Sequence, residues 1–191
     1  MGSPLRSNIP IWVAAIGPKN VQLTAELAEG WQPILFHPGR AAEVFGPSLD
    51  RGGQKRDPAL GPIDIAVQSV VAIGPDVHHH RDQVRQELAL YIGGMGAPGT
   101  NYYNELAGRY GYPEAAARIQ ELYLGGRRDE AIAAVPDELI DATSLIGSRD
   151  EVADRLAALR AAGVTTLIAK PVGPEVTDRI RVIEQLRELS T

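Results

Sequence analysis

The sequence predicts an α/β fold in which parallel strands alternate with helices. Short apolar runs rich in β-branched residues, such as 63–73, are typical of strands buried on both faces. Turn residues and then apolar positions at helical spacing follow these runs. The helix after Ser148 shows both boundary signals, because Glu151 completes a capping box and Gly163 marks the end. Strands and helices in this order imply a parallel sheet with helices outside it.

Composition sets the broad class of the protein. The 191 residues suffice for one domain with a hydrophobic core, and 44% hydrophobic with 23% charged residues is an ordinary globular balance. The net charge of -5 argues against a nucleic-acid binder. Without cysteine, disulfides and cysteine-ligated metals are excluded, and we expect a cytoplasmic location. No apolar run is long enough to predict a membrane span.

The first predicted unit, over residues 11–36, is the strongest candidate for a ligand site. A buried strand at 11–16 leads through Gly17 into a helix with Pro18 at its first position, and Gly30 is expected to end that helix in the left-handed conformation. Such a turn lies at the carboxyl end of its strand, where α/β proteins bind ligands. The free N–H groups of the helix start and the charge of Lys19 favour an anion. The alternative is an ordinary strand-to-helix turn without a ligand.

The middle of the chain reads as a helical insertion at 78–142. It contains a glycine-rich segment, Gly93-Gly94-Met95-Gly96, followed by Tyr102 and Tyr103. Glycine-rich backbone beside aromatic side chains suits the close approach of a planar ligand, whereas the alternative is a long connecting loop. A short helix at 41–49, after a turn at 37–39, precedes this region. The four core strands that we predict lie near 11–16, 31–36, 64–73 and 164–169.

Few other residues form a recognisable catalytic motif. Three adjacent histidines, His78 to His80, diverge around a helix and cannot easily share one metal ion, so we predict no metal site. His37 is expected in a surface turn. Lys170 follows the last strand and either meets an anionic group or stays without a ligand. No P-loop or Rossmann glycine pattern is present, and no catalytic residue can be assigned.

Several stretches resemble the bacterial luciferase-like flavin or deazaflavin oxidoreductases. The segments 9–20 and 25–31 are similar to the central part of that family, with Glu29 where the family usually carries aspartate. A narrower, coenzyme F420-dependent group, largely from actinobacteria, is resembled at 91–96, 101–104 and 109–112. The segments 145–148 and 165–168 are similar to the family's final repeat.

The resemblance implies the carboxyl-terminal half of a (β/α)₈ barrel, because the family's barrel has eight strands and only four are predicted here. It implies an oxidoreductase that transfers hydride between coenzyme F420 and a small organic substrate, and the alternative is an FMN-dependent monooxygenase of the same superfamily. The cofactor's phosphate-bearing tail would lie along Ala14, Ala15, Ile16, Gly17, Pro18 and Lys19. The mouth of the cofactor or substrate site would be bordered by Gly93, Gly94, Met95, Gly96 and Tyr102.

The same resemblance bears on partners and activity. The family's early strands, which hold the ring and most acid-base groups, have no counterpart in this chain. An open half barrel exposes strand edges, so we expect a homodimer or a complementary amino-terminal half-barrel. A non-catalytic half-barrel that binds a ligand or partner is the alternative from another functional class.

Overall fold

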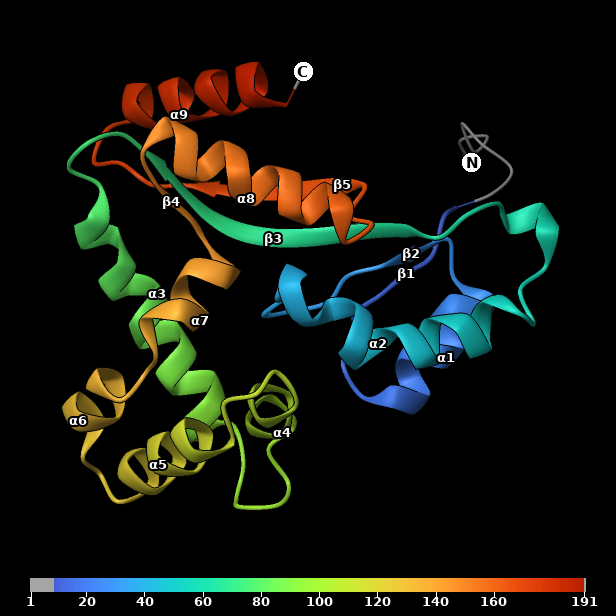
Figure 1. Ribbon diagram of the computed structural model, residues 1–191, viewed down its shortest axis with the longest axis horizontal. Coiled ribbons are helices and arrows are strands. Elements are labelled where there is room, and N and C mark those ends of the chain that lie inside the picture. Colours follow the sequence, from blue (N-terminus) through green and yellow to red (C-terminus); the bar gives the residue numbers. More distant parts are fainter. Residues whose placement is uncertain (1–8, 191) are drawn as a thin grey trace, which may run out of the picture.

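A computed structural model describes residues 9–190 as an open parallel sheet with helices around it (Figure 1). The strands are β1 (Trp12–Val13), β2 (Gly30–Trp31), β3 (Asp64–Ile73), β4 (Leu145–Gly147) and β5 (Thr166–Pro171). The helices are α1 (Pro18–Leu27), α2 (Pro38–Gly53), α3 (Arg81–Ala89), α4 (Tyr102–Arg109), α5 (Pro113–Leu124), α6 (Arg128–Ala133), α7 (Asp137–Thr143), α8 (Arg149–Ala161) and α9 (Val176–Leu189). Short helical turns lie at η1 (Pro58–Leu60), η2 (His78–His80) and the π-helix η3 (Leu90–Gly94). The predicted α/β class with parallel strands is confirmed.

Strand β3 organises the sheet. It pairs with β2 at its start, where Gly30 faces Asp64, and with β5 along 66–71. Val71 pairs with both β4 and β5, so these two strands lie on opposite sides of β3. Strand β1 pairs with β2, and within residues 9–190 no further strand pairs with the outer sides of β1 or β5. The sheet therefore has two free edges.

Helices cover one face of the sheet and build the core there. Trp31 is fully buried and meets Phe36 and Phe45 edge-on, with ring centroids 6.2 and 4.9 Å apart. Burying three aromatic side chains at one spot stabilises the contact between β2 and α2. At the other end of β3, Figure 1 shows α8 and α9 beside β5.

The structure confirms four predicted strands but changes their lengths and adds a fifth. Strand β2 ends at Trp31 instead of continuing to residue 36, because Pro33 has no N–H and Leu35 adopts the left-handed conformation (φ 52°). Only Trp12 and Val13 of the first predicted strand enter the ladder. Strand β4, which we did not predict from the sequence, pairs with the end of β3 over three residues.

Two boundary predictions in the first unit are wrong. Helix α1 ends at Leu27, and Gly30 lies instead within β2. There the Trp12 ring crosses its Cα, so that a Cβ would lie 2.2 Å from Trp12 Cδ2. Helix α2 starts at Pro38, within the expected turn, and runs through Pro47 to Gly53. It continues because Gly52 lies directly against α1, where a Cβ would be 2.2 Å from the Gln22 carbonyl.

The last helices follow their sequence signals. Ser148 and Glu151 form the predicted capping box on α8, and Gly163 adopts the left-handed conformation (φ 86°) after it.

No helix within residues 9–190 combines the length and apolar character needed to cross a membrane.

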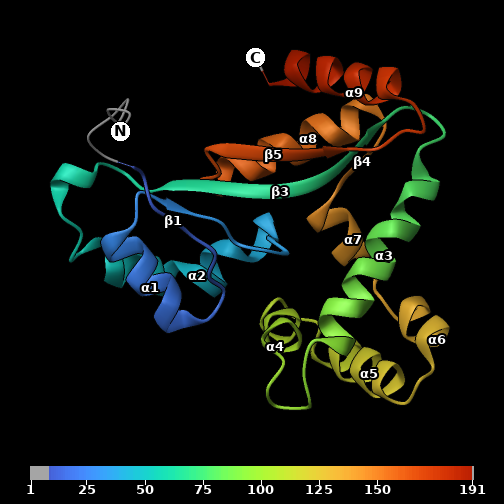
Figure 2. The ribbon, with the colours of Figure 1, turned by 180° about the vertical axis from the view of Figure 1, so that it is seen from behind.

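Between β3 and β4 the chain forms the helical region α3–α7, which Figures 1 and 2 both show gathered to one side of the strands. Charged side chains join its first and last helices. Arg85 of α3 contacts Asp137 of α7 at 2.5 Å, and Arg81 contacts Asp141 at 3.1 Å. These ion pairs join α3 to α7, the last helix before β4, and the Arg81–Asp141 pair is partly buried.

Candidate cofactor site

The turn between β1 and α1 lies at the carboxyl end of β1, as predicted. Gly17 is the N-cap of α1 and Pro18 occupies its first turn. The backbone of Gly17 (φ -74°, ψ 142°) is an extended conformation that any residue adopts, so the turn itself does not require glycine. A Cβ at Gly17 would meet no atom within 4 Å. Glycine therefore leaves open space beside the helix start.

Side chains of β2 and α4 donate hydrogen bonds to two carbonyls of this turn. The buried indole Nε1 of Trp31 donates to the Ala15 carbonyl at 2.8 Å, and Arg109 Nη1 donates to the Ile16 carbonyl at 3.3 Å. Helix α1 has no side-chain cap. Since Pro18 lacks an N–H, Lys19 and Asn20 supply the first-turn N–H groups that an anion could accept from.

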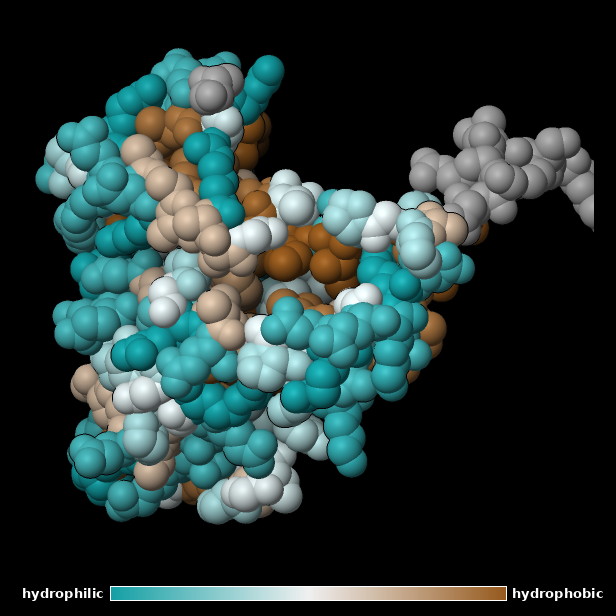
Figure 3. Space-filling view, turned by 45° about the vertical axis from the view of Figure 1, so that its right-hand side comes forward, coloured by the Kyte–Doolittle hydropathy of each residue, from teal (hydrophilic) through white to brown (hydrophobic). Residues whose placement is uncertain are grey.

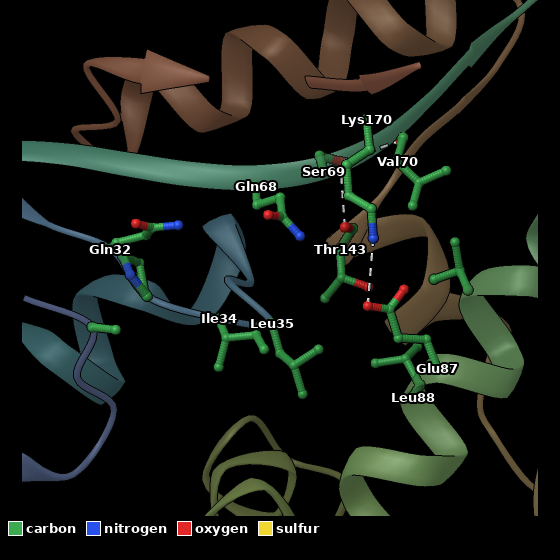
Figure 4. A pocket seen from close by; sticks show the side chains of 13 residues that line it. Gln32, Ile34, Leu35, Gln68, Ser69, Val70, Glu87, Leu88, Thr143 and Lys170 are labelled. Carbon is green, nitrogen blue, oxygen red and sulfur yellow. Dashed lines mark hydrogen bonds and ion pairs between the residues drawn. The ribbon is translucent and has the colours of Figure 1, made fainter. Parts of the chain in front are cut away.

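A cavity of about 230 Å³ opens beside the turn and includes Ala14 in its wall (Figure 4). Its apolar wall comes from the loop after β2 and from α3. Its polar side chains come from the loop after β2 and from β3, α3, α7 and β5, and they are Gln32, Gln68, Ser69, Glu87, Thr143 and Lys170. Lys170 Nζ lies 3.6 Å from Glu87 Oε1, joining β5 to α3. The anionic group that Lys170 contacts in the structure is thus the Glu87 carboxylate.

Sequence reasoning missed most of this lining. The loop 32–35 was predicted as part of a strand, and no role was predicted for Glu87. Gln68 offered a signal, because a long amide side chain interrupts the apolar run of β3. Its neighbours on β3 are buried, whereas Gln68 is exposed and lines the cavity.

The glycine-rich segment lies elsewhere and is packed against α5. A Cβ on Gly93 or Gly94 would come within 2.6 or 2.5 Å of the Tyr123 side chain. The buried Asn101 donates to the carbonyls of Tyr91 and Ile92, both at 3.0 Å, and caps α4 with its side-chain oxygen.

The candidate residues of this segment do not line the cavity beside Ala14. Gly93 is buried against α5, whereas Met95 and Tyr102 are mostly exposed. The carbonyl of Gly96 accepts from Gln120 Nε2 at 3.1 Å. Their part in binding a cofactor stays a prediction.

The histidines also lie apart from the turn. His37 is half-buried, contrary to the surface turn expected, and lies 5.4 Å from Tyr110 between ring centroids. Burial, with the charge of Arg40, lowers the pKa of His37, and burial raises the pKa of Tyr110. His37 Nδ1 and Tyr110 Oη make no hydrogen bond within the described residues. In that part of the chain no three histidine or acidic side chains are placed to hold a metal ion.

The parallel sheet, with a strand-to-helix turn at its carboxyl edge, defines an α/β protein, a class in which ligands commonly bind at this edge. The particular family follows from comparison with known proteins. The model of the luciferase-like monooxygenase family matches residues 2–166, and the chain belongs to that family of enzymes.

Two similar proteins are named as oxidoreductases or reductases, and one of the two names states a cofactor. Rv3520c of Mycobacterium tuberculosis, whose name assigns it to the coenzyme F420-dependent oxidoreductases, is 38% identical over 169 residues, covering 86% of this chain and 48% of its own. The 5,10-methylenetetrahydromethanopterin reductase of Archaeoglobus fulgidus is 30% identical and covers 92% of this chain and 52% of its own.

A solved structure supports the fold in the same way. The coenzyme F420-dependent tetrahydromethanopterin reductase from Methanopyrus kandleri superposes with a TM-score of 0.70 at 25% identity, covering 93% of this chain and 49% of its own. The chain therefore spans about half the length of the relatives that it matches. The predicted partial barrel is confirmed.

Proposed function

We propose that this chain is the carboxyl-terminal half of an oxidoreductase that transfers hydride between coenzyme F420 and a small organic substrate. One observation carries the proposal. The turn at 14–19 starts α1 without a side-chain cap, a Cβ at Gly17 would meet no atom within 4 Å, and Ala14 of the same turn lines a cavity. The names of relatives that use coenzyme F420 support this choice of cofactor.

In this proposal the residues Ala14 to Lys19 hold the phosphate-bearing tail. The N–H groups of Lys19 and Asn20 donate to the phosphate, and the Lys19 ammonium and the dipole of α1 add attraction. When bound, the deazaflavin ring supplies the hydride chemistry. The cavity, with its apolar wall and polar side chains, holds the substrate and excludes water from it.

FMN is the second candidate, because its phosphate suits the same N–H groups. Equilibrium binding separates the two cofactors. The 191-residue chain is titrated with coenzyme F420 and, separately, with FMN, and binding is measured by cofactor fluorescence. Coenzyme F420 should bind more tightly than FMN. Lys19→Ala should weaken that binding about threefold to tenfold. Lys55→Ala, an exposed lysine paired with Glu26, is the matched control and should bind unchanged. Tighter binding of FMN would overturn the choice of cofactor.

The free edges support a complementary amino-terminal half-barrel as the partner. Beside the β1 edge, α1 exposes Leu23 (54%) and Leu27 (60%), and beside the β5 edge, α9 exposes Val176 (62%) and Ile180 (52%). Each pair is four residues apart and so forms one apolar stripe on its helix. Figure 3 shows hydrophobic side chains exposed in a hollow of the surface between these parts. Apolar stripes at both free edges suit neighbours that continue the sheet on both sides.

Mixing experiments test this partner and the activity together. The chain should form a one-to-one complex with the amino-terminal half of Rv3520c, and only the mixture should oxidise or reduce coenzyme F420. Leu27→Glu should weaken the complex, whereas Leu124→Glu, an exposed leucine in the helical region, should not. A stable homodimer of the chain alone would favour the second copy as partner. A complex without turnover would favour a non-catalytic half-barrel.

We also propose a cytoplasmic location for the protein, which cell fractionation tests.

A further inference from the structure

Arg109 connects the helical region to the candidate cofactor turn. It lies at the end of α4, and 93 residues separate it from Ile16, whose carbonyl it contacts at 3.3 Å. Its other terminal nitrogen donates to the Val44 carbonyl of α2. The guanidinium carbon lies 5.6 Å from the centroid of the Phe45 ring. One side chain therefore joins α4, α2 and the turn before α1.

The direction of these contacts decides where the turn presents its N–H groups. In a trans peptide the carbonyl and the following N–H point in opposite directions. Arg109 holds the Ile16 carbonyl, so it fixes the direction of the Gly17 N–H. Trp31 holds the Ala15 carbonyl in the same way and fixes the Ile16 N–H. Two carbonyls of the turn are thus held by side chains, while a Cβ at Gly17 would meet no atom within 4 Å.

The charge of Arg109 is not neutralised by a neighbouring acid. Its hydrogen-bond partners within residues 9–190 are backbone carbonyls, and no carboxylate there pairs with it. Arg81, Arg85 and Arg155 differ, since each contacts an aspartate. A half-buried cation without a carboxylate raises the positive potential of its surroundings, here the start of α1.

We propose that Arg109 is a positioning residue for the anionic tail of the cofactor. It holds the Gly17 N–H toward the tail and adds positive charge behind the turn. The inference rests on the proposed function and extends the site to α4 of the helical region, whose helices α3 and α7 also contribute to the cavity wall.

Two ligands that differ only in the tail test this role. Coenzyme F420 and the deazaflavin riboside that lacks the phosphate-bearing tail are titrated into the chain. Arg109→Ala should bind coenzyme F420 about tenfold more weakly and the tail-less riboside as the wild type does. Arg109→Lys keeps the charge but not the fork of donors and should recover part of the loss. Arg128→Ala is the matched control, because Arg128 also lies over an aromatic ring, Tyr123, at 5.5 Å.

Hydrogen exchange gives a readout that needs no cofactor. The Val21 amide donates to the Gly17 carbonyl at 2.9 Å, and its exchange should be about tenfold faster in Arg109→Ala than in the wild type or Arg128→Ala. If the wild type binds no coenzyme F420, the proposed function fails. Hydrogen exchange at Val21 still tests whether Arg109 holds the turn. Equal binding of coenzyme F420 by Arg109→Ala and the wild type, equal losses for both ligands, or unchanged exchange at Val21 would each overturn the inference.

Discussion

Two glycine-containing segments of this chain were candidates for the same cofactor, and their surroundings differ. At Gly17 a side chain would enter empty space, whereas at Gly93 and Gly94 it would meet Tyr123 of α5. The first segment follows a strand and starts a helix, and the second is the π-helical end of a helix. Glycine serves as access to open space in one segment and as close packing between helices in the other. The residue type alone does not distinguish the two uses.

Asn101 offers the largest effect on the packed segment. Asn101→Ala removes the cap of α4 and leaves the carbonyls of Tyr91 and Ile92 without their donors. We expect a loss of about 3 kcal/mol in the free energy of unfolding, measured by urea denaturation. Asn101→Asp keeps the capping oxygen but places a second carboxylate oxygen against the two carbonyls in a buried site, so its loss should be at least as large. A loss below about 1 kcal/mol for Asn101→Ala would show that the segment is not held as described.

Gly93→Ala compares the two segments directly. Its Cβ would lie 2.6 Å from Tyr123 Cβ and 3.1 Å from the Ile119 carbonyl, so we expect a loss of about 2 kcal/mol in unfolding free energy. Gly17→Ala meets no atom and should cost at most about 1 kcal/mol, through the weaker N-cap. Chemical denaturation of both variants checks this order. Equal losses would remove the distinction between the segments.

Gly17→Ser separates stability from binding at the open turn. A serine hydroxyl accepts from the first-turn N–H groups, so the variant should be more stable by a few tenths of a kcal/mol. The same hydroxyl competes with an anionic tail, and coenzyme F420 should bind several-fold more weakly. Thermal unfolding measures the stability and cofactor titration measures the binding of coenzyme F420, both on the same preparation of each protein. Tighter binding together with higher stability would contradict an anion site at these N–H groups.

The smallest effect concerns pH and falls on the helical region. The hydrogen bond from Arg85 lowers the pKa of the Asp137 carboxyl below its ordinary value of 3.8. A carboxyl with a lowered pKa in the folded state stabilises the fold above its ordinary pKa, and this contribution is lost as the pH falls through the folded pKa. Acidification from about pH 5 to about pH 3 should therefore lower the melting temperature less in Asp137→Asn than in the wild type. Equal shifts would exclude a contribution of this pair.

Local signals account for the elements that were predicted correctly. The apolar, β-branched run of β3 marked its bounds, and the capping box of Ser148 and Glu151 marked the start of α8. The β1–α1 turn was found because a strand, a glycine and a proline at the first helical position follow one another in the sequence. Each of these features depends on neighbours within a few residues, which a sequence displays directly.

Long-range contacts account for the errors. Gly30 resembles a helix stop until the Trp12 ring is seen across it, and α2 continues past residue 49 because Gly52 packs on α1. The cavity wall was out of reach for the same reason. Glu87 and Lys170 are 83 positions apart in the chain and meet only after the sheet has formed.

By itself, the sequence determined the alternation of strands and helices, the strand-to-helix turn at Gly17 and, through resemblance, the family. These depend on local propensities and on residue order. The tertiary structure alone decided which glycines face space and which face another helix, and that Arg109 and Trp31 hold the turn from behind. Those outcomes depend on packing between residues far apart in the chain, which no local pattern of residues encodes.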